Sequence, residues 1–196
     1  MPDLDHLIAF AKFTHLLHKV ERVARIAGEE RYANTVEHSY QLALVAWYII
    51  TTHKLNMRLE KVLCYALAHD CVEAYAGDTY AYDTVSQADK ILREQQALEK
   101  IATDFSEFEE LANAIRAYDK REDIESRFVY ALDKLIDPIN IYLENGKLWK
   151  ENGVTLAMHE AYKSPKIAYD PTVQKLHEEL LRRLRAHESD FFALKK

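Results

Sequence analysis

Glycine and proline are scarce in this chain, since each occurs only four times among 196 residues. Proteins with many strands need these residues at their frequent tight turns, so the scarcity favours long helices. No apolar run approaches the roughly 18 residues that cross a membrane as a helix. The composition otherwise suits a soluble globular protein with a core, because 48% of the residues are apolar and 30% are charged.

Positive charge and cysteine are also in short supply. The net charge is −6, which argues against general affinity for nucleic acid or anionic membranes. An anionic substrate would therefore need a local positive centre. The two cysteines, Cys64 and Cys71, would lie roughly 10 Å apart along one helix, too far for a disulfide. Without a disulfide framework or a basic-then-apolar leader, we expect a cytoplasmic protein.

Helical periodicity dominates what the chain does contain. Apolar spacing and end signals predict helices over residues 3–20, 35–52, 56–76, 88–103, 107–118, 123–145, 155–163 and 171–184. Segments 21–34 and 78–87 are expected to be loops, and Thr35 is expected to cap the second helix. We therefore expect one all-α domain over residues 1–196, with its motif-bearing core at about 10–145 and its C-terminal helices at about 155–190.

Several polar residues lie on apolar faces of the predicted helices. They are His38, His69, Asp70 and Asp133, with Glu73 one turn beyond His69. Burying such groups without partners would cost several kcal/mol. Lys134 follows Asp133 in the sequence but is expected to point elsewhere on the helix, so it is a poor candidate for its partner.

Two imidazoles and two carboxylates form a donor set that suits one divalent transition ion such as Mn, Fe, Co or Ni. Zinc, which is satisfied by four or five ligands, fits less well. A buried polar network without a metal stays open as the alternative. Motifs of di-iron bundles, zincins, phosphate-binding loops and serine hydrolases are missing from the sequence.

The order His38, His69-Asp70, Asp133 resembles the HD-domain superfamily of metal-dependent phosphohydrolases. Three segments carry a finer resemblance to its YfbR-like 5′-deoxynucleotidase branch: Thr-Val-Glu-His-Ser at 35–39, Ala-His-Asp-Cys-Val-Glu-Ala-Tyr-Ala-Gly-Asp at 68–78, and Ala-Leu-Asp-Lys-Leu at 131–135. The likeness covers roughly residues 10–145. It implies an HD-type helical bundle, usually dimeric, that removes phosphate from deoxyribonucleoside 5′-monophosphates.

The resemblance also implies roles for single residues. The metal ligands would be His38, His69, Asp70 and Asp133, and Glu73 would lie beside the metal-bound water. Arg22 would contact the phosphate, with Arg25 as the competing candidate, and Asp78 would approach the sugar hydroxyl. Two departures leave base and sugar preference open: Val23 stands where the branch has tryptophan, and residues 79–82 lack its usual proline.

We therefore expect a homodimeric hydrolase of (deoxy)ribonucleoside 5′-monophosphates that uses one divalent ion, with Mn, Co, Fe or Ni favoured over Zn. Its partners are expected to be small-molecule nucleotides rather than nucleic acid or membranes. Two alternatives stay open. One is an HD-type hydrolase of nucleoside triphosphates or phosphodiesters, and the other is a catalytically degenerate nucleotide-sensing or protein-binding module. The presence of every expected ligand and of Glu73 favours an enzyme.

Overall fold

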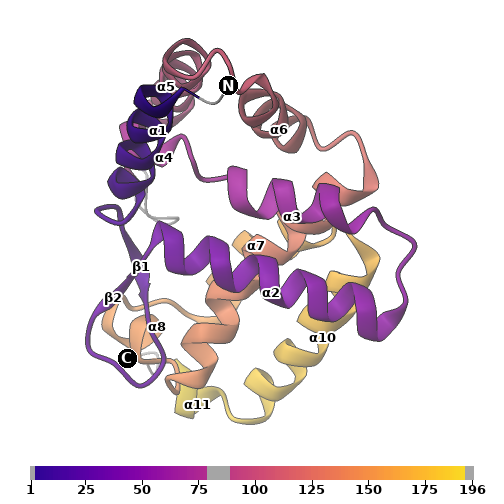
Figure 1. Ribbon diagram of the computed structural model, residues 1–196. Helices are drawn as coiled ribbons and strands as arrows, with labels where there is room; N and C mark the ends of the chain where they lie inside the picture. The colour runs from indigo at the N-terminus through magenta and orange to yellow at the C-terminus, as the bar shows by residue number, and fades with distance from the viewer. Residues whose placement is uncertain (1–2, 79–88, 193–196) are drawn as a thin grey trace. The chain divides into compact units, whose positions relative to one another are not determined.

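The computed structural model describes residues 3–78 and 89–192, which form helices and one small two-stranded sheet (Figure 1). The expected all-α class is confirmed. The chain gathers into two compact units, one of Met1–Val23 with Ala33–Lys120 and one of Ala24–Tyr32 with Arg121–Lys196. That both belong to a single domain stays a prediction.

The first unit contains the candidate site residues Arg22, His38, His69, Asp70 and Glu73. Its helices are α1 (Leu4–Leu17), α2 (Thr35–His53), α3 (Leu59–Ala68), α4 (Glu73–Ala76), α5 (Lys90–Asp104) and α6 (Glu109–Lys120). α2 and α3 lie side by side, α6 packs on α3, and α4 contacts α1 and α5. Apolar side chains such as Phe13, Ile101 and Phe105 fill the core under α1 and α5. This packing fixes the start of α2 and the end of α3, where the site lies.

The expectation that segment 21–34 is a loop is wrong. The segment contains strands β1 (Glu21–Arg25) and β2 (Tyr32–Asn34). The two strands are hydrogen-bonded neighbours, and residues 26–31 are too short a connection for a parallel crossover, so the pair is an antiparallel hairpin. The Thr35 N–H donates to the Val20 carbonyl at 3.1 Å and joins the hairpin to α2. Strands of only five and three residues show too little apolar alternation to be predicted.

The expected continuous helix over 56–76 is wrong, because it breaks between Ala68 and Glu73. The Cys71 N–H donates to the Ala68 carbonyl and the Glu73 N–H to the Asp70 carbonyl, both at 3.0 Å. These i to i−3 bonds tighten the backbone relative to an α-helix. The apolar pattern continues across the break, so periodicity alone could not reveal it. The break places the His-Asp pair at a helix end rather than in mid-helix.

The second unit consists mainly of C-terminal helices. They are α7 (Ile124–Leu143), α8 (Lys147–Glu151), α9 (Leu156–Ile167), α10 (Pro171–Ala186) and α11 (Glu188–Phe191). α7, α9 and α10 pack on one another, and α8 contacts α7 and α11. The short helices α8 and α11 were not predicted, since one turn or little more carries no clear period.

Gly146 forms the turn between α7 and α8 with φ at 71°. This left-handed conformation favours glycine. A Cβ added at this position would lie 2.0 Å from the carbonyl oxygen of Phe191. The turn therefore depends on glycine both for its backbone angle and for the close approach of α11.

Neither cysteine is paired, since Cys64 is exposed and Cys71 is buried as free thiols. Burial raises the pKa of the Cys71 thiol to about 12, so no thiolate nucleophile is available there at neutral pH. None of the described helices is both long enough and apolar enough to cross a membrane.

Candidate metal centre

His38 enters the site from the first turns of α2. The Asn34 side chain accepts from the Glu37 N–H at 3.0 Å, and the Glu37 carboxylate accepts from the Asn34 N–H at 3.0 Å. This reciprocal capping box fixes where the helix begins. His38, four positions after the capping residue Asn34, is buried. The prediction that Thr35 caps this helix is wrong, because Asn34 already supplies the capping oxygen.

His69 directly follows the last residue of α3 and is buried. Its Nδ1 lies 3.0 Å from the carbonyl oxygen of Ala66. A carbonyl oxygen only accepts, so this contact requires the proton on Nδ1, and in the neutral ring Nε2 then carries the lone pair. That is the tautomer that a metal ligand needs.

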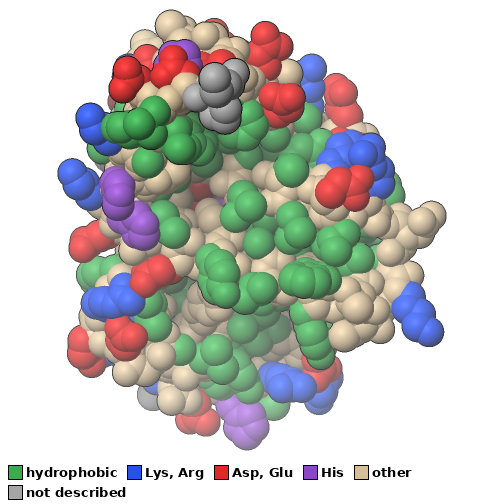
Figure 2. Space-filling view, viewed as in Figure 1, with side chains coloured by type: hydrophobic (Ala, Val, Ile, Leu, Met, Phe, Trp, Pro, Cys, Tyr) green, Lys and Arg blue, Asp and Glu red, His purple; other side chains and the backbone are tan. Residues whose placement is uncertain are grey.

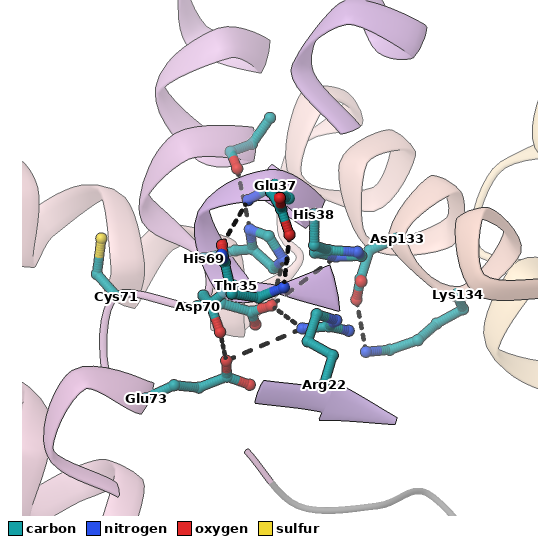
Figure 3. Close-up of polar contacts among 12 residues, drawn as sticks. Arg22, Thr35, Glu37, His38, His69, Asp70, Cys71, Glu73, Asp133 and Lys134 are labelled. Carbon is teal, nitrogen blue, oxygen red and sulfur yellow. Dashed lines mark hydrogen bonds and ion pairs between the residues drawn. The ribbon is translucent and has the colours of Figure 1, made fainter. Parts of the chain in front are cut away.

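The two imidazoles converge on one oxygen, Asp70 Oδ2 (Figure 3). His69 Nε2 lies 2.9 Å from this oxygen, and His38 Nε2 lies 3.8 Å from it. One ligand atom from each of the three residues lies within 4.8 Å of the others. The first unit thus brings together the three predicted ligands that it contains.

This donor set fits a divalent cation. His69 Nε2 and Asp70 Oδ2 lie 2.9 Å apart, and each can offer a lone pair to the same cation. Imidazole and carboxylate are also common ligands of transition-metal ions. The Ala66 carbonyl and the Tyr118 ring, whose centroid lies 5.4 Å from that of His69, hold the His69 ring in place. The cluster can therefore bind a metal ion.

Arg22 reaches the same carboxylate oxygen from β1. Its Nη1 lies 2.8 Å from Asp70 Oδ2 and 3.9 Å from Glu73 Oε2. Arg25, the competing candidate, belongs to the second unit. There its Nη1 lies 2.7 Å from Glu151 Oε2, and its guanidinium lies 5.1 Å from the Tyr32 ring centroid. Arg22 thus contacts the cluster within the first unit.

Glu73 is the first residue of α4 and is 5% exposed. Thr35 Oγ1 donates a hydrogen bond of 2.7 Å to Glu73 Oε2. Burial raises the pKa of Glu73 well above its ordinary value, and the negative charge of Asp70 adds to the rise, while Arg22 opposes it. A raised pKa of this kind is typical of carboxyl groups that act in proton transfer.

Asp133 lies on α7 in the second unit and is 3% exposed. The expectation that Lys134 is a poor partner is wrong, because Lys134 Nζ lies 2.5 Å from Asp133 Oδ2. A long, flexible lysine side chain can bend back to a neighbouring carboxylate even though the two residues leave the helix in different directions. This ion pair within the second unit therefore offsets part of the cost of burying the Asp133 carboxylate. The role of Asp133 as a metal ligand stays a prediction.

Asp78 is half-buried just beyond α4, and its negative charge contributes to the raised pKa of Glu73. Its predicted contact with a sugar is not tested. The proline-free segment 79–82 lies outside the described residues.

Thr35 is a site residue that we missed. The available signal was a hydroxyl side chain three positions before His38, which is equally typical of a helix cap.

The chain is similar in sequence to several known proteins. The family model for the HD domain matches residues 15–176. The zebrafish (Danio rerio) protein 5′-deoxynucleotidase HDDC2 is 27% identical over 135 residues, which cover 67% of this chain and 66% of that protein. Its human counterpart is 27% identical over 63% of this chain and 62% of its own length. The matches thus span slightly less than two thirds of these relatives.

Solved structures show the same fold. The crystal structure of a "predicted metal-dependent phosphohydrolase" from Magnetospirillum magnetotacticum superposes with a TM-score of 0.82, at 26% identity, over 96% of each chain. A conserved hypothetical protein from Pyrococcus furiosus is similar in fold alone, with a TM-score of 0.61 at 20% identity over 93% of this chain and all of that one. This chain therefore belongs to the HD-domain family of metal-dependent phosphohydrolases.

Proposed function

We propose that the protein removes phosphate from (deoxy)ribonucleoside 5′-monophosphates in a metal-dependent reaction. The observation that carries the proposal is the partly buried cluster in which Arg22, Asp70 and Glu73 lie next to two imidazoles. It combines possible metal ligands, a cation for phosphate and a carboxyl group for proton transfer. The names of the HDDC2 relatives support a 5′-nucleotidase over other phosphohydrolases.

The metal would be held by His38, His69 and Asp70, with Asp133 as the fourth ligand. Asp133 enters the proposal through its place in the ordered HD motif and its burial on α7. Two neutral nitrogens and two carboxylates suit Mn, Co, Fe or Ni, which accept further oxygen ligands, better than Zn. Such an ion would supply a water of lowered pKa and would neutralise charge on phosphoryl oxygens.

The other site residues act on the substrate and its protons. Arg22 would grip the phosphate through its fork of N–H donors, which gives an acidic protein a local positive centre. Glu73 would orient the attacking water or deliver a proton to the leaving 5′ oxygen. Asp78 would accept a hydrogen bond from a sugar hydroxyl.

The proposal includes a cytoplasmic homodimer. Free cysteines are compatible with a reducing compartment.

The composition of α2 favours the dimer, because this helix carries no Asp, Glu, Lys or Arg between Glu37 and His53. Its exposed face instead presents Tyr40, Leu44, Trp47 and Tyr48, and hydrophobic side chains gather over α2 and α3 (Figure 2). A uniformly uncharged face can pair with itself about a twofold axis.

Light scattering of the purified protein tests the dimer. We expect the mass of two chains, and we expect Trp47→Glu to shift it towards one chain. Ile91→Glu, at an exposed apolar position of α5, is the control and should stay dimeric. A wild-type protein with the mass of one chain would contradict this part of the proposal.

A phosphate-release screen tests the reaction. The panel comprises ribo- and deoxyribonucleoside mono- and triphosphates and a phosphodiester, each with Mn²⁺, Co²⁺, Ni²⁺ or Mg²⁺. We expect inorganic phosphate from the 5′-monophosphates. Pyrophosphate from a triphosphate, or cleavage of the diester alone, would favour the corresponding alternative hydrolase. Inactivity with every pair of substrate and metal would favour a nucleotide-sensing module.

A further inference from the structure

Thr35 is a buried hydroxyl residue of the first unit to which the proposed reaction gives no role. It is the first residue of α2, lies three positions before His38 and is 1% exposed. Its hydroxyl is not needed to cap the helix, because Asn34 supplies the capping oxygen. The hydroxyl instead donates a 2.7 Å hydrogen bond to Glu73 Oε2 (Figure 3).

This bond joins two parts of the site that lie 38 positions apart in the sequence. Thr35 opens the helix that carries His38, and Glu73 opens the short helix that follows the His69-Asp70 pair. Both side chains are buried. A hydrogen bond to a carboxylate is strong and directional when water is excluded. It therefore fixes one oxygen of Glu73 relative to the helix that bears a proposed ligand.

Arg22 also lies near the Glu73 carboxylate, but it does not replace the hydrogen bond from Thr35. Its Nη1 lies 3.9 Å from Glu73 Oε2, which is beyond hydrogen-bond distance. The same nitrogen lies 2.8 Å from Asp70 Oδ2. Arg22 therefore attracts the Glu73 carboxylate electrostatically, whereas Thr35 supplies the short contact that sets its orientation.

We propose that Thr35 is a positioning residue, whose hydroxyl holds the Glu73 carboxylate in the orientation that proton transfer requires. The inference rests on the proposed function, since it assigns Thr35 to the same reaction. The Thr35 hydroxyl contacts Glu73, which is proposed to act in proton transfer and not in binding the metal or the phosphate. Losing this hydroxyl therefore lowers kcat and leaves KM and metal binding nearly unchanged. Misplacing a catalytic group by a fraction of an ångström is enough to slow turnover.

Two substitutions separate the hydroxyl from the shape of the side chain. Thr35→Val keeps the branched shape and removes the donor, and we expect kcat to fall by about 10- to 100-fold, as for a lost hydrogen bond to a charged group. Thr35→Ser keeps the donor and should retain kcat within about threefold. Thr52→Val is the control on the same helix, because the Thr52 hydroxyl donates to the Tyr48 carbonyl, and it should behave as wild type. If Thr35→Val does not fold, Thr35→Ala takes its place.

A double-mutant cycle with Glu73 supplies a readout that a merely structural role would not produce. In the Glu73→Gln background, Thr35→Val should lower the residual kcat no further, because the group that Thr35 positions has already been replaced. Metal content, measured by mass spectrometry of the purified variants, should stay at the wild-type ratio.

Three results would overturn the proposal: a wild-type kcat in Thr35→Val, a Thr35→Ser as slow as the valine variant, or an equal loss in both Glu73 backgrounds. If the wild-type protein itself releases no phosphate, the proposed function is contradicted and the positioning role falls with it. If the wild type is active and Thr35→Val matches it, the positioning role alone fails.

Discussion

Arg22 Nη1 lies 2.8 Å from Asp70 Oδ2, although the residues are 48 positions apart. β1 brings the guanidinium to the carboxylate on which the His38 and His69 rings also converge. In a chain of net charge −6, this contact places a cation beside the candidate metal centre. An anionic substrate thus has a local positive centre that overall composition does not provide.

The position of Arg22 predicts a loss of phosphate binding when it is replaced. Arg22→Ala should lower kcat/KM by about 10- to 100-fold, because charge-assisted hydrogen bonds to phosphate are worth roughly 1.5–3 kcal/mol. Arg25→Ala removes the ion pair with Glu151 instead and should leave kcat/KM near wild type. Steady-state kinetics on a 5′-monophosphate measures both. A larger loss in Arg25→Ala than in Arg22→Ala would reverse the assignment.

Glu73 should be required for turnover but not for assembly of the metal site. Both Glu73→Ala and the isosteric Glu73→Gln should bind metal at the wild-type ratio and lower kcat by about 100- to 10,000-fold, the usual contribution of general acid–base catalysis. Kinetics together with metal analysis of the same samples tests this. Near-normal turnover in either variant would remove the proposed role of Glu73.

Gly146 should be irreplaceable for stability. Gly146→Ala places a Cβ 2.0 Å from the Phe191 carbonyl oxygen, so α11 must move. Gly153→Ala is the matched control, since its φ of 62° is also left-handed but nothing lies within 4 Å of the added atom. We expect Gly153→Ala to cost about 1–2 kcal/mol for the backbone alone and Gly146→Ala clearly more. Urea unfolding measures both, and equal losses would contradict the steric argument.

His159 and His177 should make the second unit sensitive to acid. Their Nε2 atoms lie 3.2 Å apart, so one neutral ring donates to the other. Burial lowers the pKa of His159 to about 3 and that of His177 to about 4. Unfolded histidine has a pKa of about 6.5, so the unfolded state gains protons first as the pH falls. The two histidines therefore make their whole contribution to the free energy of unfolding above about pH 6.5, and this contribution is lost progressively towards pH 3–4.

Urea unfolding at two pH values tests this pair. The free energy of unfolding should fall by roughly 2–4 kcal/mol between pH 7.5 and pH 5 through these two groups. His177→Gln removes one of them and should make the decrease smaller. His53→Gln, at an exposed position at the end of α2, should keep the wild-type decrease. An unchanged pH dependence in His177→Gln would show that the pair does not control acid stability.

The helical class and much of the cluster were predictable from the sequence because they depend on residue type and spacing. His38 stands out on an apolar helical stripe, and the His69-Asp70 pair stands out within an apolar run. The structure brings these three side chains together. Rare polar residues on apolar faces report local burial, and that signal survives even where helix ends are misplaced.

What could not be predicted depends on backbone detail and side-chain reach. The break after Ala68 leaves no mark on the apolar pattern, because the tightened turn carries buried residues as a helix would. Thr35 and Asn34 are both typical caps, and only the structure shows that Asn34 caps the helix and Thr35 binds Glu73. Lys134 turns back to Asp133, which helical spacing does not foresee.

The most direct test of the account is phosphate release by protein from which metal has been stripped with a chelator. Stripped protein should not hydrolyse a deoxyribonucleoside 5′-monophosphate, and added Mn²⁺ or Co²⁺ should restore turnover at about one ion per chain. His69→Asn, which removes a proposed ligand, should neither bind the ion at that ratio nor recover activity. Full phosphate release by the stripped protein, or by His69→Asn without bound metal, would contradict the central claim.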